Sequence, residues 1–255
     1  MPLFLSEKQI KLYLIFLHKN LPKNPTAVAG FYKLPKQFHE NVIKSNFSEA
    51  SLQEISNHMG YFLGIIKSVK ITFIEQTSDS RWTASSDGTI SNNNDLTHAG
   101  LYRPAGHDHG EIYIIKKNKY QFKHVMAILA HEYTHHYLYL HNVRKNDVQD
   151  NEMLTEIASA YLGLGQYLVD GYDRIVWSSN GSTHSLQLGY VQPHTIKRVI
   201  YLSAKLRKWD PKEVVSSFSS FSDRINAFVE MWFYKRALKK ARLQEEKRIS
   251  QNNTH

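Results

Sequence analysis

The sequence predicts an α+β fold, with a small mixed sheet in its N-terminal half followed by a mainly helical C-terminal half. Three observations lead to this prediction. β-branched residues alternate with polar ones from Val69 to Glu75, and a second short β-rich run covers Glu111 to Lys116. From Gln121 onwards the apolar residues recur with helical spacing. Strand patterns followed by a series of helix patterns are typical of α+β chains.

Two helices are expected before the sheet, within Met1–Asn20 and over Ser48–His58. Ser6 and Gln9 have the spacing of a capping box at the start of the first helix, where each side chain satisfies a backbone N–H of the other residue. The apolar stretch of this helix is short and charged residues precede it, so we interpret it as amphipathic and not as a signal peptide.

The segment between the two predicted strands is polar. Trp82–Ala84 and Thr89–Ile90 flank Ser85–Gly88, which has the composition of a hairpin turn. Asn92–Gly110 contains Gly, Pro and three consecutive Asn, so a loop is expected there. The strand Glu111–Lys116 then leads towards the first long helix.

Helices are expected over most of the remaining chain. Their predicted positions are Gln121 to about His141, Asn151 to about Asp170, Pro193 to about Lys208, a helix that starts at Asp210-Pro211, and Phe228 to Ser250. Asp210 suits an N-cap and Pro211 the first helical position. Val143–Asp150 and Gly171–Gly189 are expected to be a turn and a loop. We interpret residues 1–255 as one domain in three parts, at about 1–60, 61–170 and 171–255.

The amino-acid composition limits the class of protein and the ligands that are available to a metal ion. The 255 residues are 42% hydrophobic and 12% aromatic, which is enough for a sizeable core and excludes a disordered chain. There is no cysteine, so disulfides and thiolate ligands are excluded and a bound zinc ion would need His, Asp or Glu. The net charge of +9 is compatible with a nucleic-acid or anionic-membrane partner, or with a solvated Lys-rich surface.

The motif that suggests metal binding and catalysis is His131-Glu132-Tyr133-Thr134-His135. Residues four apart lie on one face of a helix, so both imidazoles can bind one metal ion. Glu132 is rotated by about 100° from His131, where it can contact a zinc-bound water rather than the metal. A zinc-bound water has a pKa near 7, and Glu132 can take its proton as a general base.

Two carboxylates on the following helix are candidates for the third ligand. Glu152 and Glu156 are four residues apart and share a face, which continues with the small residues Ser159 and Gly163. Such a face can pack closely on another helix and direct its acids towards that helix. No Lys or Arg lies between Asn151 and Tyr167, as would be common on a solvated helix face.

This combination resembles the zincin metallopeptidases of the gluzincin type, which use His-Glu-x-x-His and a downstream Glu as third ligand. The resemblance covers roughly Glu111 to Gly165, and it implies a zincin-like fold with one Zn²⁺ ion. It implies that His131, His135 and Glu152 are ligands and that Glu132 is the base. Glu156 matches the supporting position, where the family usually has Asp. The residues leave open the reverse assignment, with Glu156 as ligand and Glu152 as support, although the order favours Glu152.

The same resemblance suggests two further features. Zincins often supply an oxyanion donor from downstream of the third ligand, and Tyr190 and His194 are the candidates for this role, with His184 next. The strand before the active-site helix is often a sheet edge that pairs with an extended substrate. Glu111–Lys116 resembles that strand, and the alternative is an ordinary paired strand.

The sequence therefore predicts a zinc-dependent hydrolase, more specifically a metallopeptidase that acts on a peptide or protein substrate. A catalytically idle zincin fold that binds a peptide or a regulatory partner is one alternative, and a basic nucleic-acid-associated protein is another. No specific nucleic-acid partner is predicted. Because the chain shows no signal peptide and no apolar run long enough to span a bilayer, the expected location is the cytoplasm.

Overall fold

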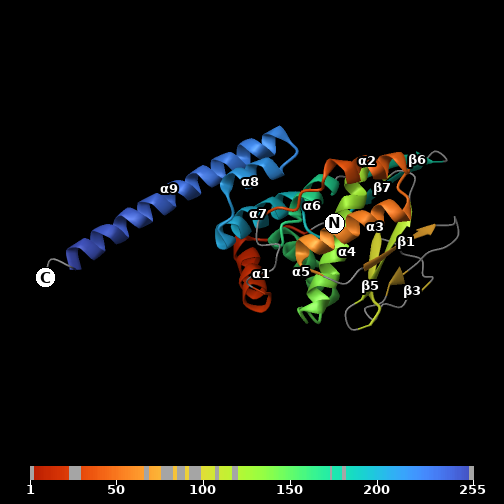
Figure 1. Cartoon of the computed structure of the whole chain (residues 1–255), viewed down its shortest axis with the longest axis horizontal. Coiled ribbons are helices and arrows are strands. Elements are labelled where there is room, and N and C mark those ends of the chain that lie inside the picture. The colour runs from red at the N-terminus through yellow and green to blue at the C-terminus, as the bar shows by residue number, and fades with distance from the viewer. Residues whose placement is uncertain are drawn as a thin grey trace.

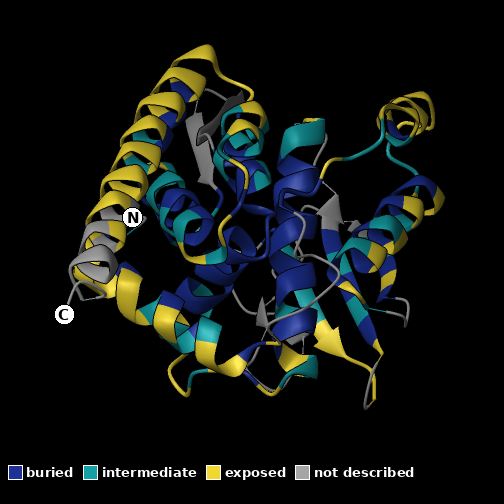
Figure 2. Cartoon of the chain, turned by 60° about the vertical axis from the view of Figure 1, so that its left-hand side comes forward, coloured by how far each residue is buried: buried dark blue, intermediate teal, exposed yellow. Residues whose placement is uncertain are grey.

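The centre of the fold is one long helix, α4 (Phe122–Leu140), which packs against other helices and against a small sheet (Figure 1). The computed structural model describes residues 3–22, 30–65, 69–75, 83–84, 90–91, 99–106, 109–116, 120–172, 174–179 and 182–252. Buried side chains lie on every face of α4, which Figure 2 shows as a mostly dark blue helix. Because α4 is packed on all sides, it is a rigid support for the side chains that it carries.

Some of the other helices pack directly on α4, and the rest pack on those helices or on one another. They are α1 (Glu7–Asn20), α2 (Lys36–Lys44), α3 (Glu49–Leu63), α5 (Val148–Tyr161), α6 (Gly165–Gly171), α7 (Pro193–Arg207), α8 (Pro211–Ser217) and α9 (Phe221–Asn252). The capping box is confirmed, since the Ser6 hydroxyl accepts from the Gln9 backbone N–H and the Gln9 side chain accepts from the Ser6 N–H. Asp210 caps α8 by accepting from the backbone N–H of Lys212, as predicted.

The strands confirm the prediction of an α+β fold with a small mixed sheet. They are β1 (Val69–Glu75), β2 (Thr83–Ala84), β3 (Ile90–Ser91), β4 (Gly100–Pro104), β5 (Gly110–Lys116), β6 (Arg174–Ser179) and β7 (Ser182–Gln187). The main sheet has the order β1-β5-β4, with β1 parallel and β4 antiparallel to β5. β2 and β3 pair in antiparallel orientation, and the predicted turn Ser85–Gly88 lies outside the described residues.

Two segments that the sequence predicts to be loops contain strands. β4 lies within the expected loop Asn92–Gly110, and the antiparallel pair β6–β7 lies within Gly171–Gly189. β4 contains Gly100 and Pro104, and β6 and β7 are rich in serine. Gly and Pro are depleted in strands, so β4 depends on pairing with β5, whereas Ile175, Val176 and Trp177 favour a strand at β6 and were overlooked within the predicted loop.

β5 occupies the centre of the sheet, so of the two alternatives for Glu111–Lys116 the structure has the ordinary paired strand and not the exposed edge. Ile112 of β5 pairs with Ile71 of β1 on one side and with Tyr102 of β4 on the other. Ile112 and Ile114 are fully buried, because both edges of β5 are paired and α4 packs on the sheet. The edge strand next to α4 is β4.

The helix expected over Asn151–Asp170 is two helices. α5 begins at Val148, inside the predicted turn, with the Asp147 side chain accepting from the backbone N–H of Asp150 at 2.8 Å. It ends before Gly163, whose φ of +88° is a conformation that L side chains rarely adopt. α9 also begins earlier than the predicted Phe228, and α2 lies in a segment for which the sequence predicts no element.

The N-terminal segment holds the chain just before α7. Leu3 forms an isolated parallel bridge with Val191, in which the Leu3 N–H donates to the Tyr190 carbonyl at 2.7 Å and the Gln192 N–H donates to the Leu3 carbonyl at 3.1 Å. Residues 190–192 are thereby fixed in space. Among the described helices, none combines the length and the apolar character that a membrane span requires.

Candidate metal centre

Three side chains from two helices converge on one point. His131 and His135 lie one turn apart on α4, and Glu152 lies on α5, which packs against α4. The Nε2 of His131 is 3.0 Å from Oε2 of Glu152, and the Nε2 of His135 is 3.2 Å from the same oxygen. The two Nε2 atoms are 3.1 Å apart. All three side chains are largely buried, so the group lies inside the fold with a small opening to solvent.

The chemistry of this group suits a metal ion. Ligands that surround zinc tetrahedrally at about 2.0–2.1 Å are separated from one another by roughly 3.3–3.4 Å, and the separations of 3.0–3.2 Å are close to that value. Two imidazole nitrogens and one carboxylate oxygen are ligands that zinc commonly takes. His131, His135 and Glu152 could therefore hold one metal ion.

The electrostatics of the metal-free group are those of an ion pair. Burial would raise the pKa of Glu152, but the charge on His135 and the hydrogen bonds with His131 and His135 outweigh it and hold this pKa well below its usual range. Burial lowers the pKa of His131, whereas the hydrogen bond with Glu152 and the neighbouring carboxylates raise it to about 9. A metal ion that binds here must displace the proton that His131 shares with Glu152, since only a neutral imidazole is a ligand.

The distal nitrogen of His135 meets a hydroxyl group on α5. The Nδ1 of His135 is 3.2 Å from Oγ1 of Thr155, and this hydroxyl donates to the Asn151 carbonyl at 2.9 Å. Because the hydroxyl proton is used in that bond, the Thr155 oxygen can accept a hydrogen bond from the Nδ1–H group of His135. This arrangement favours the His135 tautomer that has its proton on Nδ1 and directs the lone pair of Nε2 towards His131 and Glu152.

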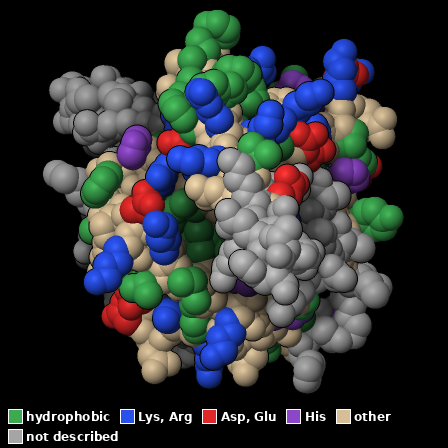
Figure 3. Space-filling model, turned by 90° about the vertical axis from the view of Figure 1, so that its left-hand side faces the viewer, with side chains coloured by type: hydrophobic (Ala, Val, Ile, Leu, Met, Phe, Trp, Pro, Cys, Tyr) green, Lys and Arg blue, Asp and Glu red, His purple; other side chains and the backbone are tan. Residues whose placement is uncertain are grey.

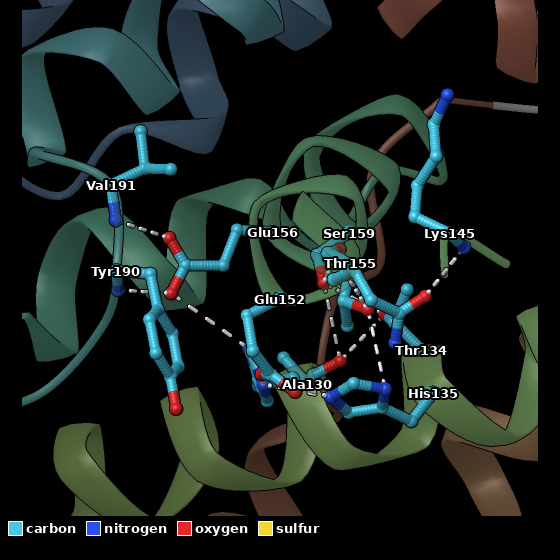
Figure 4. A network of polar contacts seen from close by, with 12 residues as sticks. Ala130, Thr134, His135, Lys145, Glu152, Thr155, Glu156, Ser159, Tyr190 and Val191 are labelled. Carbon is cyan, nitrogen blue, oxygen red and sulfur yellow. Dashed lines mark hydrogen bonds and ion pairs between the residues drawn. The ribbon is translucent and has the colours of Figure 1, made fainter. Parts of the chain in front are cut away.

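The distal nitrogen of His131 faces Glu156 instead. The Nδ1 of His131 makes no hydrogen bond to the described residues, and it lies 3.9 Å from Oε1 of Glu156. Glu156 is fully buried and accepts a hydrogen bond from the Tyr172 hydroxyl at 2.8 Å. It also accepts from the backbone N–H groups of Tyr190 and Val191, each at 2.7 Å (Figure 4). Burial raises the pKa of Glu156, and His131 and these three donors partly oppose the rise.

Glu156 thus lies outside the group of three ligand atoms and behind His131. Of the two arrangements that the sequence left open, this geometry matches Glu152 as ligand and Glu156 as support. The small residue on the same face has a packing role, because Ser159 is fully buried and donates to α4 through Oγ1 of Thr134 at 2.8 Å. Gly163 lies beyond α5 and packs on the backbone of Gly30.

The catalytic candidate Glu132 points to the start of the edge strand β4. Glu132 is buried, and a Cβ atom at Gly100 would lie only 2.8 Å from its Oε1. A larger residue at the start of β4 would therefore displace the carboxylate. The charge of Glu132 contributes to raising the pKa of His131 and of Tyr190, which places Glu132 electrostatically next to both residues.

Tyr190 lies at the metal group and His194 does not. The Tyr190 ring is nearly parallel to the His131 ring, with 6.3 Å between centroids, and burial together with Glu152, Glu132 and Glu156 raises the pKa of its phenol. The hydroxyl therefore keeps its proton at neutral pH and can donate. His194 is exposed at the start of α7 and stacks on Phe4. Among the described contacts, none joins His194 to the ligands, so its expected role as an oxyanion donor has no geometric support.

The other histidines near the motif have local partners. His124 is buried, and its Nδ1 accepts from the backbone N–H of Gln121 at 2.9 Å at the start of α4. His136 is fully buried, with its Nδ1 3.0 Å from the Tyr102 hydroxyl. Tyr102 of β4 also lies parallel to the His135 ring at 6.5 Å. The side chain of His184 is not among the described ones.

Three supporting residues were missed by the sequence-based reasoning: Thr155, Tyr172 and Tyr102. Thr155 was detectable in principle, because it follows Glu152 by three residues and so shares its helix face. Tyr172 and Tyr102 carried no such signal, since their roles depend on where α6 ends and on the pairing of β4.

Comparisons with protein-family models, with curated proteins and with solved structures found no match to this chain.

Proposed function

We propose that this protein is a zinc-dependent metallohydrolase and that its substrates are peptides or proteins. The observation that carries the proposal is the convergence of His131, His135 and Glu152, with Glu132 next to His131 on the same buried helix. A zinc ion held by these ligands would lower the pKa of a bound water to about 7 and polarise the carbonyl that the water attacks.

The residues around the ligands suit the remaining steps. Glu132 accepts the proton of the attacking water and passes it to the leaving nitrogen, which is general base and then general acid catalysis. Tyr190, whose phenol stays protonated, donates a hydrogen bond to the negative charge that develops on the carbonyl oxygen. A peptide can add to the outer edge of β4, which pairs with no strand among the described residues and whose first residue contacts Glu132.

The test measures zinc and turnover separately. The purified protein is dialysed with zinc and its metal content determined by mass spectrometry, and cleavage of a peptide library is followed by mass spectrometry. We expect one zinc per chain, with cleavage that chelation stops. Glu132→Gln should retain zinc and lower the cleavage rate by about 10²–10⁴-fold.

Glu54→Gln is the matched control, because Glu54 is an exposed carboxylate on α3 away from the metal group. It should change neither zinc content nor cleavage. A protein that takes up no zinc, or a Glu132→Gln variant as active as the wild type on a verified substrate, would refute the proposal. One bound zinc without turnover of any peptide would instead favour the partner-binding alternative.

A further inference from the structure

One side of α9 exposes large apolar side chains to solvent. Phe221, Ile225, Phe228 and Trp232 follow one another at intervals of four, three and four residues, so they share one helix face. Phe221 is 77% exposed and Phe228 is 60% exposed. The opposite side of α9 packs on the body through the buried residues Ala227 and Met231. Contiguous exposed apolar surface of this kind marks an interaction site.

The outer face, defined by Phe221, Ile225, Phe228 and Trp232, carries no acidic residue of this part of α9. The acidic residues between positions 221 and 240 are Asp223 and Glu230. Asp223 forms an ion pair with Lys197, and Glu230 binds Arg198 at 2.9 Å and Lys205 at 3.3 Å, all on α7. Both acids are therefore turned towards the body and neutralised there.

The outer face becomes basic in the next turns of α9. Arg236 and Lys239 follow Trp232 by four and seven residues on the same face, and both are exposed. Seven Lys and Arg residues stand against two Glu residues from position 235 to 248. This half of α9 extends away from the body (Figure 1). Figure 3 views the molecule from the side towards which α9 points, and it shows apolar side chains gathered at the top of this face with Lys and Arg side chains beside them.

A partner must match both the apolar and the basic part of this face. A second copy of the chain would bring two strongly basic helices together, which is repulsive. A nucleic acid would match the basic residues and could stack on aromatic rings, but it offers nothing to Ile225 or to the exposed Val229. The surface of an anionic bilayer matches both, because apolar side chains enter the acyl boundary while Lys and Arg contact the lipid headgroups.

We propose that α9 docks the protein on membranes rich in anionic lipid, with Phe221, Ile225, Phe228 and Trp232 inserted and Arg236 and Lys239 on the headgroups. The full-length protein is sedimented with vesicles of phosphatidylcholine and phosphatidylglycerol in equal parts, and with vesicles of phosphatidylcholine alone. Binding is expected to the anionic vesicles and to weaken as salt is added, because salt screens the lipid charge.

Two substitutions on the outer face separate the two contributions. Phe228→Glu is expected to lower the partition coefficient for anionic vesicles about tenfold or more, since the Phe side chain that would insert into the bilayer is lost. Lys239→Gln is expected to lower it about fivefold, the effect of one basic residue at such a surface. Tyr61→Glu and Lys44→Gln are the matched controls, because these exposed side chains lie on α3 and α2, and they should bind as the wild type. All four positions are exposed, and unchanged thermal unfolding would verify that the variants fold.

Three results would overturn the proposal. The first is no sedimentation with anionic vesicles, or equal sedimentation with neutral ones. The second is a dimer in solution that Phe228→Glu dissociates, with no vesicle binding, which would assign the face to a second copy. The third is salt-sensitive binding of an RNA oligonucleotide in the absence of vesicle binding.

Discussion

The two histidines of the candidate metal centre are supported in different ways. Behind His131 lies the fully buried carboxyl group of Glu156, 3.9 Å from Nδ1 and held by three hydrogen bonds. Behind His135 lies the neutral hydroxyl of Thr155, 3.2 Å from Nδ1. Both supports come from α5, one residue apart, but only the first is ionisable.

This difference separates two tasks of a supporting residue. A hydroxyl group can fix the tautomer and the orientation of an imidazole, whereas a carboxylate also makes the imidazole a stronger base and ligand. Glu156 has a further effect, because its donors Tyr190 and Val191 belong to the segment that Leu3 holds. The His131 side therefore connects the candidate metal site to the N-terminal segment, whereas the hydroxyl behind His135 bonds only within α5.

The largest effect is expected where the two sides meet, at the Glu152 oxygen that both imidazoles contact. Glu152→Gln should lower zinc affinity by about 10²–10³-fold, since about a quarter of the roughly 10–16 kcal/mol of a four-ligand zinc site is lost. Competition titration with a chromophoric chelator measures this, with Glu54→Gln as control. Unchanged affinity would exclude Glu152 as a ligand and transfer the role to Glu156.

The next largest effect is expected at the charged support. Glu156→Gln places an amide NH₂ group against N–H and O–H donors in a fully buried position. We expect a loss of about 2–4 kcal/mol in the free energy of unfolding, together with a roughly 10–100-fold loss of zinc affinity, the typical effect of a supporting residue. Guanidinium unfolding of the chelator-treated protein gives the first value. A variant as stable as the wild type would show that the carboxyl group does not hold residues 190–192.

A smaller effect is expected at the neutral support. Thr155→Val keeps the shape of the side chain but removes the acceptor for Nδ1 of His135, so zinc affinity should fall about tenfold and stability by about 1 kcal/mol. Thr155→Ser should restore the affinity, because it returns the hydroxyl. If Thr155→Val and Thr155→Ser bound zinc equally well, the tautomer of His135 would not depend on this hydroxyl. Thr155 would then not be a support of His135 in the way that Glu156 is proposed to be of His131.

Relations within one helix were predictable from the sequence. Intervals of four residues put His131 with His135, and Glu152 with Glu156, on common faces because the helix repeat is local and regular. The caps at Ser6 and Asp210 were predictable for the same reason, since each bond spans two or three residues. The absence of cysteine restricted the possible zinc ligands without any structure.

Relations between distant segments were decided by the tertiary structure. Which carboxylate meets the histidines depends on how α5 lies against α4, and the preference for Tyr190 over His194 depends on the bridge between Leu3 and Val191. The strand β4 is weak in local propensity and exists because β5 offers it a partner. Likewise, the apolar residues of α9 are compatible with core or interface in the sequence, and only the packing of the opposite face on the body leaves Phe228 and its neighbours exposed. Long-range pairing and packing selected each of these outcomes, because the local sequence is compatible with more than one.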